Sequence, residues 1–306
     1  MRSRRPKETT RFNSLADALA AFENEHFPLP GLSTERTKAA FLEQLIDSIH
    51  RVEYFERIEQ RPLDPRRADP SSNLFCPIRA AIFHRRAGNF DEACWLAFLA
   101  IHFNPHKYYG WQPLQALYSS LGTPPGWTWV NVSNRTRDFE DWLRQNYSEM
   151  QQVFPGGCFG NHRKYETINP NSNSGTDKVI QTYIDIVGAN RGHRNFLHQE
   201  GGGADLTPEQ RFANLYRRLD RVHRFGRTAK FDYLCMLAKL GLADIKPDRP
   251  YIPEATGPLR GAKLAFTGSF DTNIPKTQLE KKAMNLADAL AVGMQEIEDC
   301  LCNWQK

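Results

Sequence analysis

Residues 208–230 hold the chain's clearest candidates for binding phosphate. Seven basic residues stand there against two acidic ones, Glu209 and Asp220. A helix that begins at this point would offer unpaired N–H groups and a partial positive charge at its N-terminus. We therefore expect the stretch to bind a nucleic-acid backbone, and the alternative is a basic helix face that is merely solvated. The residues predicted to contact DNA are Arg218, Arg224, Gly226, Arg227, Thr228 and Lys230.

A second cluster follows three glycines, at positions 156, 157 and 160. It combines hydrogen-bond donors, positive charge and an aromatic face, which a phosphate or an extruded base would require. A basic loop without a ligand is the alternative. The residues proposed for a base pocket are Asn161, His162, Arg163, Lys164 and Tyr165 from this cluster, together with the later Tyr251.

Two carboxylates follow the basic stretch. Asp244 and Asp248 stand 18 and 22 positions after Gly226. A carboxylate beside a sugar that is losing its base would stabilise the positive charge developing there. The ordinary alternatives are a helix cap for Asp244 and a turn residue beside Pro247 for Asp248.

A pair of helices is expected to position these groups. Thr207 and Gln210 have capping-box spacing around Pro208, so a first helix should begin there and run to about His223. Gly226 is expected to supply the positive φ of the turn. The second helix should carry apolar residues at helical spacing and end at Gly241; these residues are Phe231, Leu234, Leu237 and Leu240.

The stretch Phe225-Gly226-Arg227-Thr228-Ala229, followed by Ile245-Lys246-Pro247-Asp248, resembles the helix-hairpin-helix element of DNA glycosylases. That resemblance implies a turn that grips the DNA backbone and a catalytic carboxylate at Asp248, with Asp244 as its rival. Some glycosylases carry a lysine two residues after the turn glycine, which attacks the sugar and allows strand cleavage. This chain has Thr228 there, so the resemblance implies that water removes the base and that the reaction stops at an abasic site.

The Asn161–Tyr165 cluster and the phrase Lys246-Pro-Asp-Arg-Pro-Tyr251 resemble the alpha-glutamyl/putrescinyl thymine pyrophosphorylases. That likeness covers roughly residues 75–270. It implies either excision of a modified, hypermodified or glucosylated pyrimidine from phage DNA as anti-phage defence, or a base hypermodification that displaces pyrophosphate from an activated hydroxymethylpyrimidine. A non-enzymatic DNA-binding module is the third hypothesis.

Strand signals are scarce and amphipathic helical patterns are frequent, so we expect an all-α protein. With the resemblance, this predicts two helical lobes flanking a cleft. The expected parts are a flexible basic arm over residues 1–11, an N-terminal lobe over 12–155 and a glycosylase-like lobe over 156–306. Residues 257–263 are expected to form a short basic loop, and a terminal helix should begin at Pro275.

Composition excludes several classes of protein. The 306 residues carry a net charge of +5 and six scattered cysteines without a C-x-x-C pair, so we expect neither metal, disulfide nor cofactor. No apolar run is long enough to span a membrane, and no signal peptide is recognisable. We expect a cytoplasmic protein that has DNA as its partner, without an evident obligate protein partner.

Overall fold

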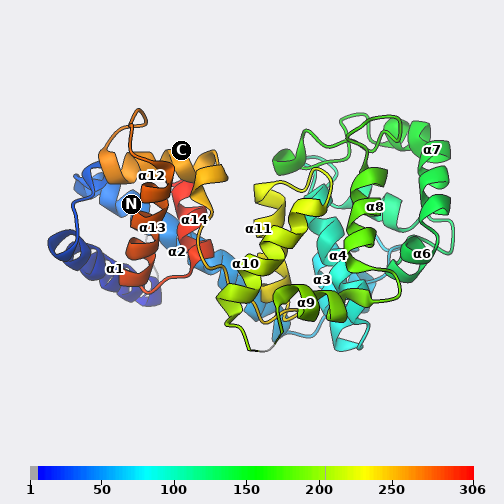
Figure 1. Ribbon diagram of the computed structural model, residues 1–306, viewed down its shortest axis with the longest axis horizontal. Helices are drawn as coiled ribbons and strands as arrows, with labels where there is room; N and C mark the ends of the chain where they lie inside the picture. Colours follow the sequence, from blue (N-terminus) through cyan, green and yellow to red (C-terminus); the bar gives the residue numbers. More distant parts are fainter. Residues whose placement is uncertain (1–5, 204) are drawn as a thin grey trace. The chain divides into compact units, whose positions relative to one another are not determined.

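The computed structural model describes residues 6–203 and 205–306. Within these ranges the chain forms fourteen α-helices joined by loops and short 3₁₀ turns, without a strand (Figure 1). The prediction of an all-α protein is confirmed. No helix in the described part of the chain is both long and apolar enough to cross a membrane.

The chain divides into two compact units. The terminal unit joins Met1–Arg57 to Pro247–Lys306, and the central unit is Ile58–Lys246. The lobe boundary expected between residues 155 and 156 falls inside the central unit, because helices from both sides of it pack on one another there. Residues 1–5 of the expected arm lie outside the described residues, and from Pro6 the chain is helical.

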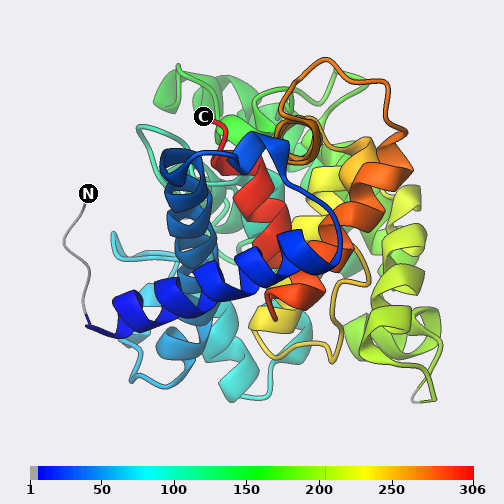
Figure 2. The same ribbon diagram turned by 90° about the vertical axis from the view of Figure 1, so that its left-hand side faces the viewer.

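The terminal unit is built from helices near both chain ends. Its helices are α1 (Pro6–Glu25), α2 (Glu35–Glu59, which ends just past the division), α12 (Gly257–Thr267), α13 (Lys276–Ala289) and α14 (Met294–Asn303). Figure 2 shows the blue α1 and α2 beside the orange and red C-terminal helices. Leu19, Phe22 and Phe41 share their apolar core with Leu279 and Leu301.

Two expectations for the terminal unit are wrong. Residues 257–263 belong to helix α12, because Pro258 is tolerated in a first helical turn and the glycine at 261 lets the helix approach α14. A Cβ at Gly261 would lie 1.8 Å from the Leu301 carbonyl oxygen. The expected single terminal helix is two helices, α13 and α14, with a break between Ala289 and Met294.

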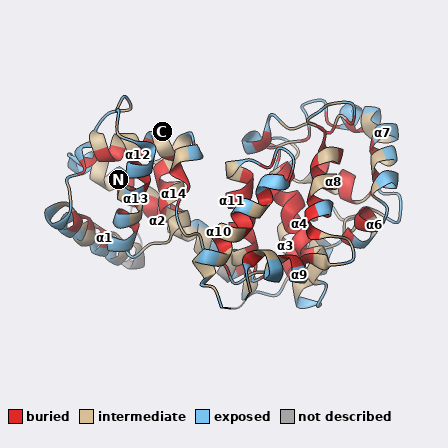
Figure 3. Ribbon diagram, viewed as in Figure 1, coloured by how far each residue is buried: buried red, intermediate tan, exposed pale blue. Residues whose placement is uncertain are grey.

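The central unit surrounds α4 (Phe90–Phe103), which is buried from Ala93 to Phe103 (Figure 3). α4 contacts α3 (Pro77–Arg86), α5 (Gln112–Tyr118), α6 (Trp129–Asn134), α9 (Gly192–Gly201) and α11 (Arg227–Lys239). The unit also holds α7 (Thr136–Val153), α8 (Thr176–Val187) and α10 (Pro208–Arg218). A helix that is apolar on every face is buried on every face, as its composition predicts.

A buried polar chain ties four of these helices together. The Asp91 carboxylate of α4 accepts from Nδ1 of His193 in α9 at 2.8 Å, and Nε2 of His193 lies 2.8 Å from the Tyr183 hydroxyl of α8. That hydroxyl lies 2.6 Å from the hydroxyl of Tyr233 in α11. Each polar side chain of this series therefore has a partner, as a low-dielectric interior requires.

Candidate functional site

A helical hairpin forms where the sequence predicts it. α10 begins at Pro208 behind a complete capping box of Thr207 and Gln210, continues as a 3₁₀ turn over Leu219–Arg221, and is followed by α11 from Arg227 to Lys239. Leu234 and Leu237 are buried, so the apolar face of α11 packs as the periodicity indicates. The hairpin positions a turn, residues 222–226, between its two helices.

The turn differs from the prediction in which residue takes the positive φ. Gly226 has φ −70°, an ordinary value, whereas Arg224 has φ +53°. A Cβ built at Gly226 would meet no atom within 4 Å. Neither backbone geometry nor protein packing therefore requires glycine at 226. The cap residue of α11 is Gly226, so it supplies no side-chain oxygen to the first N–H groups of the helix.

The basic residues predicted to bind DNA have different surroundings. Lys230 is buried, pairs with Asp220 and lies 4.0 Å from the centroid of the Tyr216 ring. Arg218 forms an ion pair with Glu200 at 3.2 Å. Both cations have ion-pair partners within the central unit, although Arg218 shares Glu200 with Arg191, and burial makes Lys230 unsuited to contact a phosphate. Arg227 and Thr228, at the start of α11, are half-buried.

The predicted base cluster lies on a 3₁₀ turn, Asn161–Arg163, and the residues after it. Asn161, His162, Lys164 and Tyr165 are exposed, and the Lys164 ammonium lies 5.0 Å from the centroid of the Tyr165 ring. Arg163 points inward instead: its Nε donates to the Ile101 carbonyl at 3.0 Å, and its guanidinium lies 6.0 Å from the centroid of the Phe225 ring. Burial lowers the pKa of Arg163.

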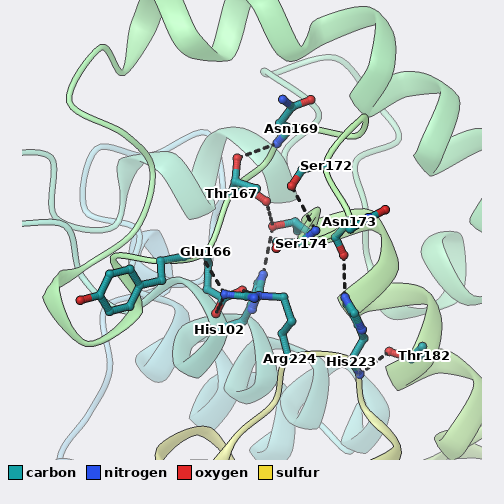
Figure 4. Close-up of polar contacts among 12 residues, drawn as sticks. His102, Glu166, Thr167, Asn169, Ser172, Asn173, Ser174, Thr182, His223 and Arg224 are labelled. Atoms are coloured by element: carbon teal, nitrogen blue, oxygen red, sulfur yellow. Dashed lines mark hydrogen bonds and ion pairs between the residues drawn. The ribbon is translucent and has the colours of Figure 1, made fainter.

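The structure brings this cluster beside the hairpin turn. Residues 165–175, here called the pocket loop, are held at both ends by the two residues that precede Phe225 (Figure 4). Arg224 donates to the Glu166 carboxylate at 3.1 Å and to the Tyr165 carbonyl at 3.1 Å. His223 Nε2 lies 2.7 Å from the Asn173 carbonyl oxygen. The basic cluster and the turn, about 60 residues apart in sequence, thus form one surface.

The base of the pocket loop is closed by polar contacts. The Thr176 amide donates to the Thr167 carbonyl at 2.9 Å, and the Thr176 hydroxyl lies 3.1 Å from Nε2 of the buried His102. Burial lowers the pKa of His102 to about 3, so its imidazole is neutral at physiological pH. The loop is therefore fixed at its base by the contacts of Thr176 and is also held by the turn near both of its ends.

A pocket of about 240 Å³ opens beside this loop. Of the proposed base-pocket residues Lys164 lines it, together with Glu166, which the sequence did not single out. Burial raises the pKa of Cys158, another lining residue, to about 12, so its thiol is protonated and not a nucleophile at neutral pH. The remaining lining residues are Tyr147, Gln151, Phe154, Pro155, Gly156, Gly157, Phe159, Thr167 and Ile168.

Asp232, on the second turn of α11, is a further candidate that sequence reasoning missed. Burial raises the pKa of its carboxyl group, and nearby positive charges oppose that rise. These charges are Arg163, Lys239, Arg227 and His162. The sequence did offer a signal for this residue. Asp232 stands six positions after Gly226, at the start of a helix whose other charged residues there are basic. The Asp232 carboxyl group therefore interacts with charges from both the base cluster and the hairpin.

The two predicted catalytic carboxylates lie in different units. Asp244 belongs to the central unit, is largely exposed and pairs with Arg211. Asp248 belongs to the terminal unit, where its Oδ1 accepts from the Tyr251 hydroxyl at 2.8 Å. Tyr251 is 2% exposed, so its ring is covered by protein. The catalytic roles of Asp248 and Asp244 and the base-pocket role of Tyr251 stay predictions.

In the part of the chain that the structure describes, the fold is all-helical, and a helix N-terminus with glycine as its cap residue lies beside a basic, glycine-rich loop. A family model described as alpha-glutamyl/putrescinyl thymine pyrophosphorylase clade 3 matches residues 36–306, and the chain belongs to this family. No curated protein and no solved structure matches the chain. The predicted likeness to this family is confirmed, whereas membership of the helix-hairpin-helix glycosylase superfamily stays a prediction.

Proposed function

We propose that the protein modifies DNA by displacing pyrophosphate from an activated hydroxymethylpyrimidine, with an amine or amino acid as the nucleophile. The family match over residues 36–306 is the observation that carries this proposal. The family's description supports this alternative better than base excision, the main prediction from sequence. The surface formed by the turn and the pocket loop supplies the charges that such a reaction requires.

In this reaction the bond between the methylene carbon and the pyrophosphate oxygen breaks, and a carbon–nitrogen bond forms. Pyrophosphate leaves with the electron pair, and the attacking amine loses one proton. Negative charge on the leaving group is stabilised by positive groups fixed in advance. His162, Arg227 and the N–H groups at the start of α11 are our candidates for that role, and Lys164 is the candidate at the pocket.

A proton acceptor completes the proposed chemistry. Asp232 has a pKa that burial raises, and a carboxylate with a raised pKa is a better general base near neutral pH. We assign Asp232 as the candidate base. Asp232→Asn should then lower kcat by roughly 10²–10⁴-fold. Asp185→Asn is the matched control, because Asp185 is an exposed carboxylate on α8 that hydrogen-bonds Gln181.

One assay separates the three hypotheses. The protein is incubated with duplexes carrying thymine, hydroxymethyluracil, its pyrophosphorylated form or glucosylated hydroxymethylcytosine, with and without an added amine. Pyrophosphate release together with an amine adduct on the base supports the proposal. Abasic sites would instead identify a glycosylase, for which Asp248→Asn is the diagnostic variant. DNA binding without either product would leave a non-enzymatic binding module.

A further inference from the structure

Arg224 holds the pocket loop through contacts that a phosphate could replace. Its guanidinium reaches both oxygens of Glu166, at 3.1 and 3.4 Å, and the Tyr165 carbonyl at 3.1 Å. The planar fork of arginine matches a phosphate as well as it matches a carboxylate. One third of the Arg224 side chain remains exposed, so DNA can reach it without unfolding the turn.

The backbone of Arg224 is held in a conformation that favours release. A φ of +53° is costly for a residue with a Cβ, and it persists only where surrounding contacts enforce it. The contacts to Glu166 and Tyr165 are such contacts. A phosphate that replaces them therefore removes contacts that offset this cost.

A second cation, Arg163, lies near Glu166. The Glu166 amide donates to the Arg163 carbonyl at 2.9 Å, and the charge of Glu166 acts on the Arg163 guanidinium. Nη2 of Arg163 is buried without a hydrogen-bond partner among the described residues. A buried donor without a partner is costly, so Nη2 of Arg163 is placed to donate to the Glu166 carboxylate when Arg224 leaves.

We propose that Arg224 and Glu166 form a latch that a DNA phosphate opens. In the free protein the latch fixes the pocket loop against the hairpin turn. When the turn binds DNA, Arg224 moves to a phosphate, Glu166 turns to Arg163, and the pocket loop is released so that the pocket can admit a base. Arg224 is thus a positioning residue, and the inference rests on DNA as the substrate of the proposed function.

Hydrogen exchange of the pocket-loop amides, followed by mass spectrometry, tests the latch. Without DNA, Arg224→Ala and Glu166→Gln should each speed this exchange by about tenfold or more, since a charge-assisted hydrogen-bond pair is lost. Saturating duplex DNA at low salt should speed the exchange in the wild type towards that of Arg224→Ala. In Glu166→Gln the loop is already released, so DNA should change its exchange little.

Arg221→Ala is the matched control. Arg221 is an exposed arginine in the same connection between the helices, without an ion pair among the described residues. This variant should weaken DNA binding while its pocket loop still responds to DNA.

Three outcomes would overturn the latch. The first is pocket-loop exchange in Arg224→Ala that is as slow as in the wild type. The second is exchange in the wild type that DNA leaves unchanged or slows. The third is a response to DNA in Glu166→Gln that equals the response of the wild type. Product formation with an unresponsive loop refutes the latch alone. A responsive loop without pyrophosphate release refutes the proposed chemistry alone, and absent DNA binding refutes both.

Discussion

Gly226 illustrates what a single residue can reveal about a ligand. The protein itself does not need glycine there, since φ is −70° and a Cβ would meet nothing within 4 Å. Glycine is also used where a ligand must approach the backbone closely. At the residue scale Gly226 is therefore the position where the predicted phosphate site can be tested.

Gly226→Ala should separate folding from binding. The allowed φ and the open space predict that the free energy of unfolding changes by less than about 1 kcal/mol, since lost cap preference and reduced chain entropy oppose each other. DNA affinity should fall several-fold, because the methyl group blocks the approach of a phosphate. Urea denaturation and fluorescence anisotropy give the two quantities. A variant that binds DNA with unchanged affinity would contradict a phosphate site at this glycine.

His102 makes stability depend on pH. Its pKa is lowered by burial from 6.5 to about 3, so the folded state resists the protonation that the unfolded state accepts. The contribution of His102 to the free energy of unfolding is fully present above pH 6.5 and is lost as pH falls towards 3. At pH 5 the loss from this residue is about 2 kcal/mol. His102→Gln should therefore flatten the acid limb of a stability–pH curve measured by urea denaturation.

Glu92 provides the opposing control. Burial raises its pKa to about 7, while the Tyr118 hydroxyl and the Trp129 amide donate to its carboxylate. A raised carboxyl pKa contributes stability that is present below 4.5 and is lost as pH rises through 7. Glu92→Gln should therefore steepen the acid limb that His102→Gln flattens. Equal slopes in both variants would rule out this assignment.

At the scale of elements, the turn between α10 and α11 concentrates backbone strain in Arg224. Replacing Arg224 by alanine removes the contacts to Glu166 but keeps the cost of φ +53°, whereas glycine removes both. Arg224→Gly should therefore be more stable than Arg224→Ala by about 1 kcal/mol. Thermal or urea denaturation of the two variants measures the difference. Equal stability would mean that the turn relaxes around alanine.

The elements were predictable where the signal is local. The capping box of Thr207 and Gln210 fixes the start of α10, and apolar spacing fixes the face that α11 buries. Residues 257–263 were read as a loop because glycine and proline usually break helices. In the structure the glycine at 261 instead permits close packing on Leu301, a contact about 40 residues away that no local pattern encodes.

The candidate site was predictable in composition but not in pairing. Lys230 and Arg224 look alike in sequence, yet Lys230 is buried against Asp220, whereas Arg224 contacts Glu166 with a third of its side chain exposed. Which cation remains available depends on partners that are distant in the chain. Asp232 was missed for the same reason, because its neighbour Arg163 comes from another segment.

At the scale of the whole molecule, the central unit carries its own core around α4. We expect the fragment Ile58–Lys246 to fold alone, because its helices bury their apolar faces on one another. It should unfold cooperatively in urea and keep the near-ultraviolet circular dichroism of packed Trp95 and Trp129. A fragment with helical content but without that signal would show that its core depends on the rest of the chain.

The terminal unit draws its helices from stretches separated by the 189 residues Ile58–Lys246. A ribosome adds roughly 5–20 residues per second, so α1 and α2 wait on the order of 10–40 s for α12, α13 and α14 to emerge. During that interval Leu19, Phe22 and Phe41 lack the apolar residues of α12, α13 and α14 that they pack against in the folded protein. The nascent chain is then exposed to self-association, which makes it a natural client for chaperones that shield apolar helices until translation is finished.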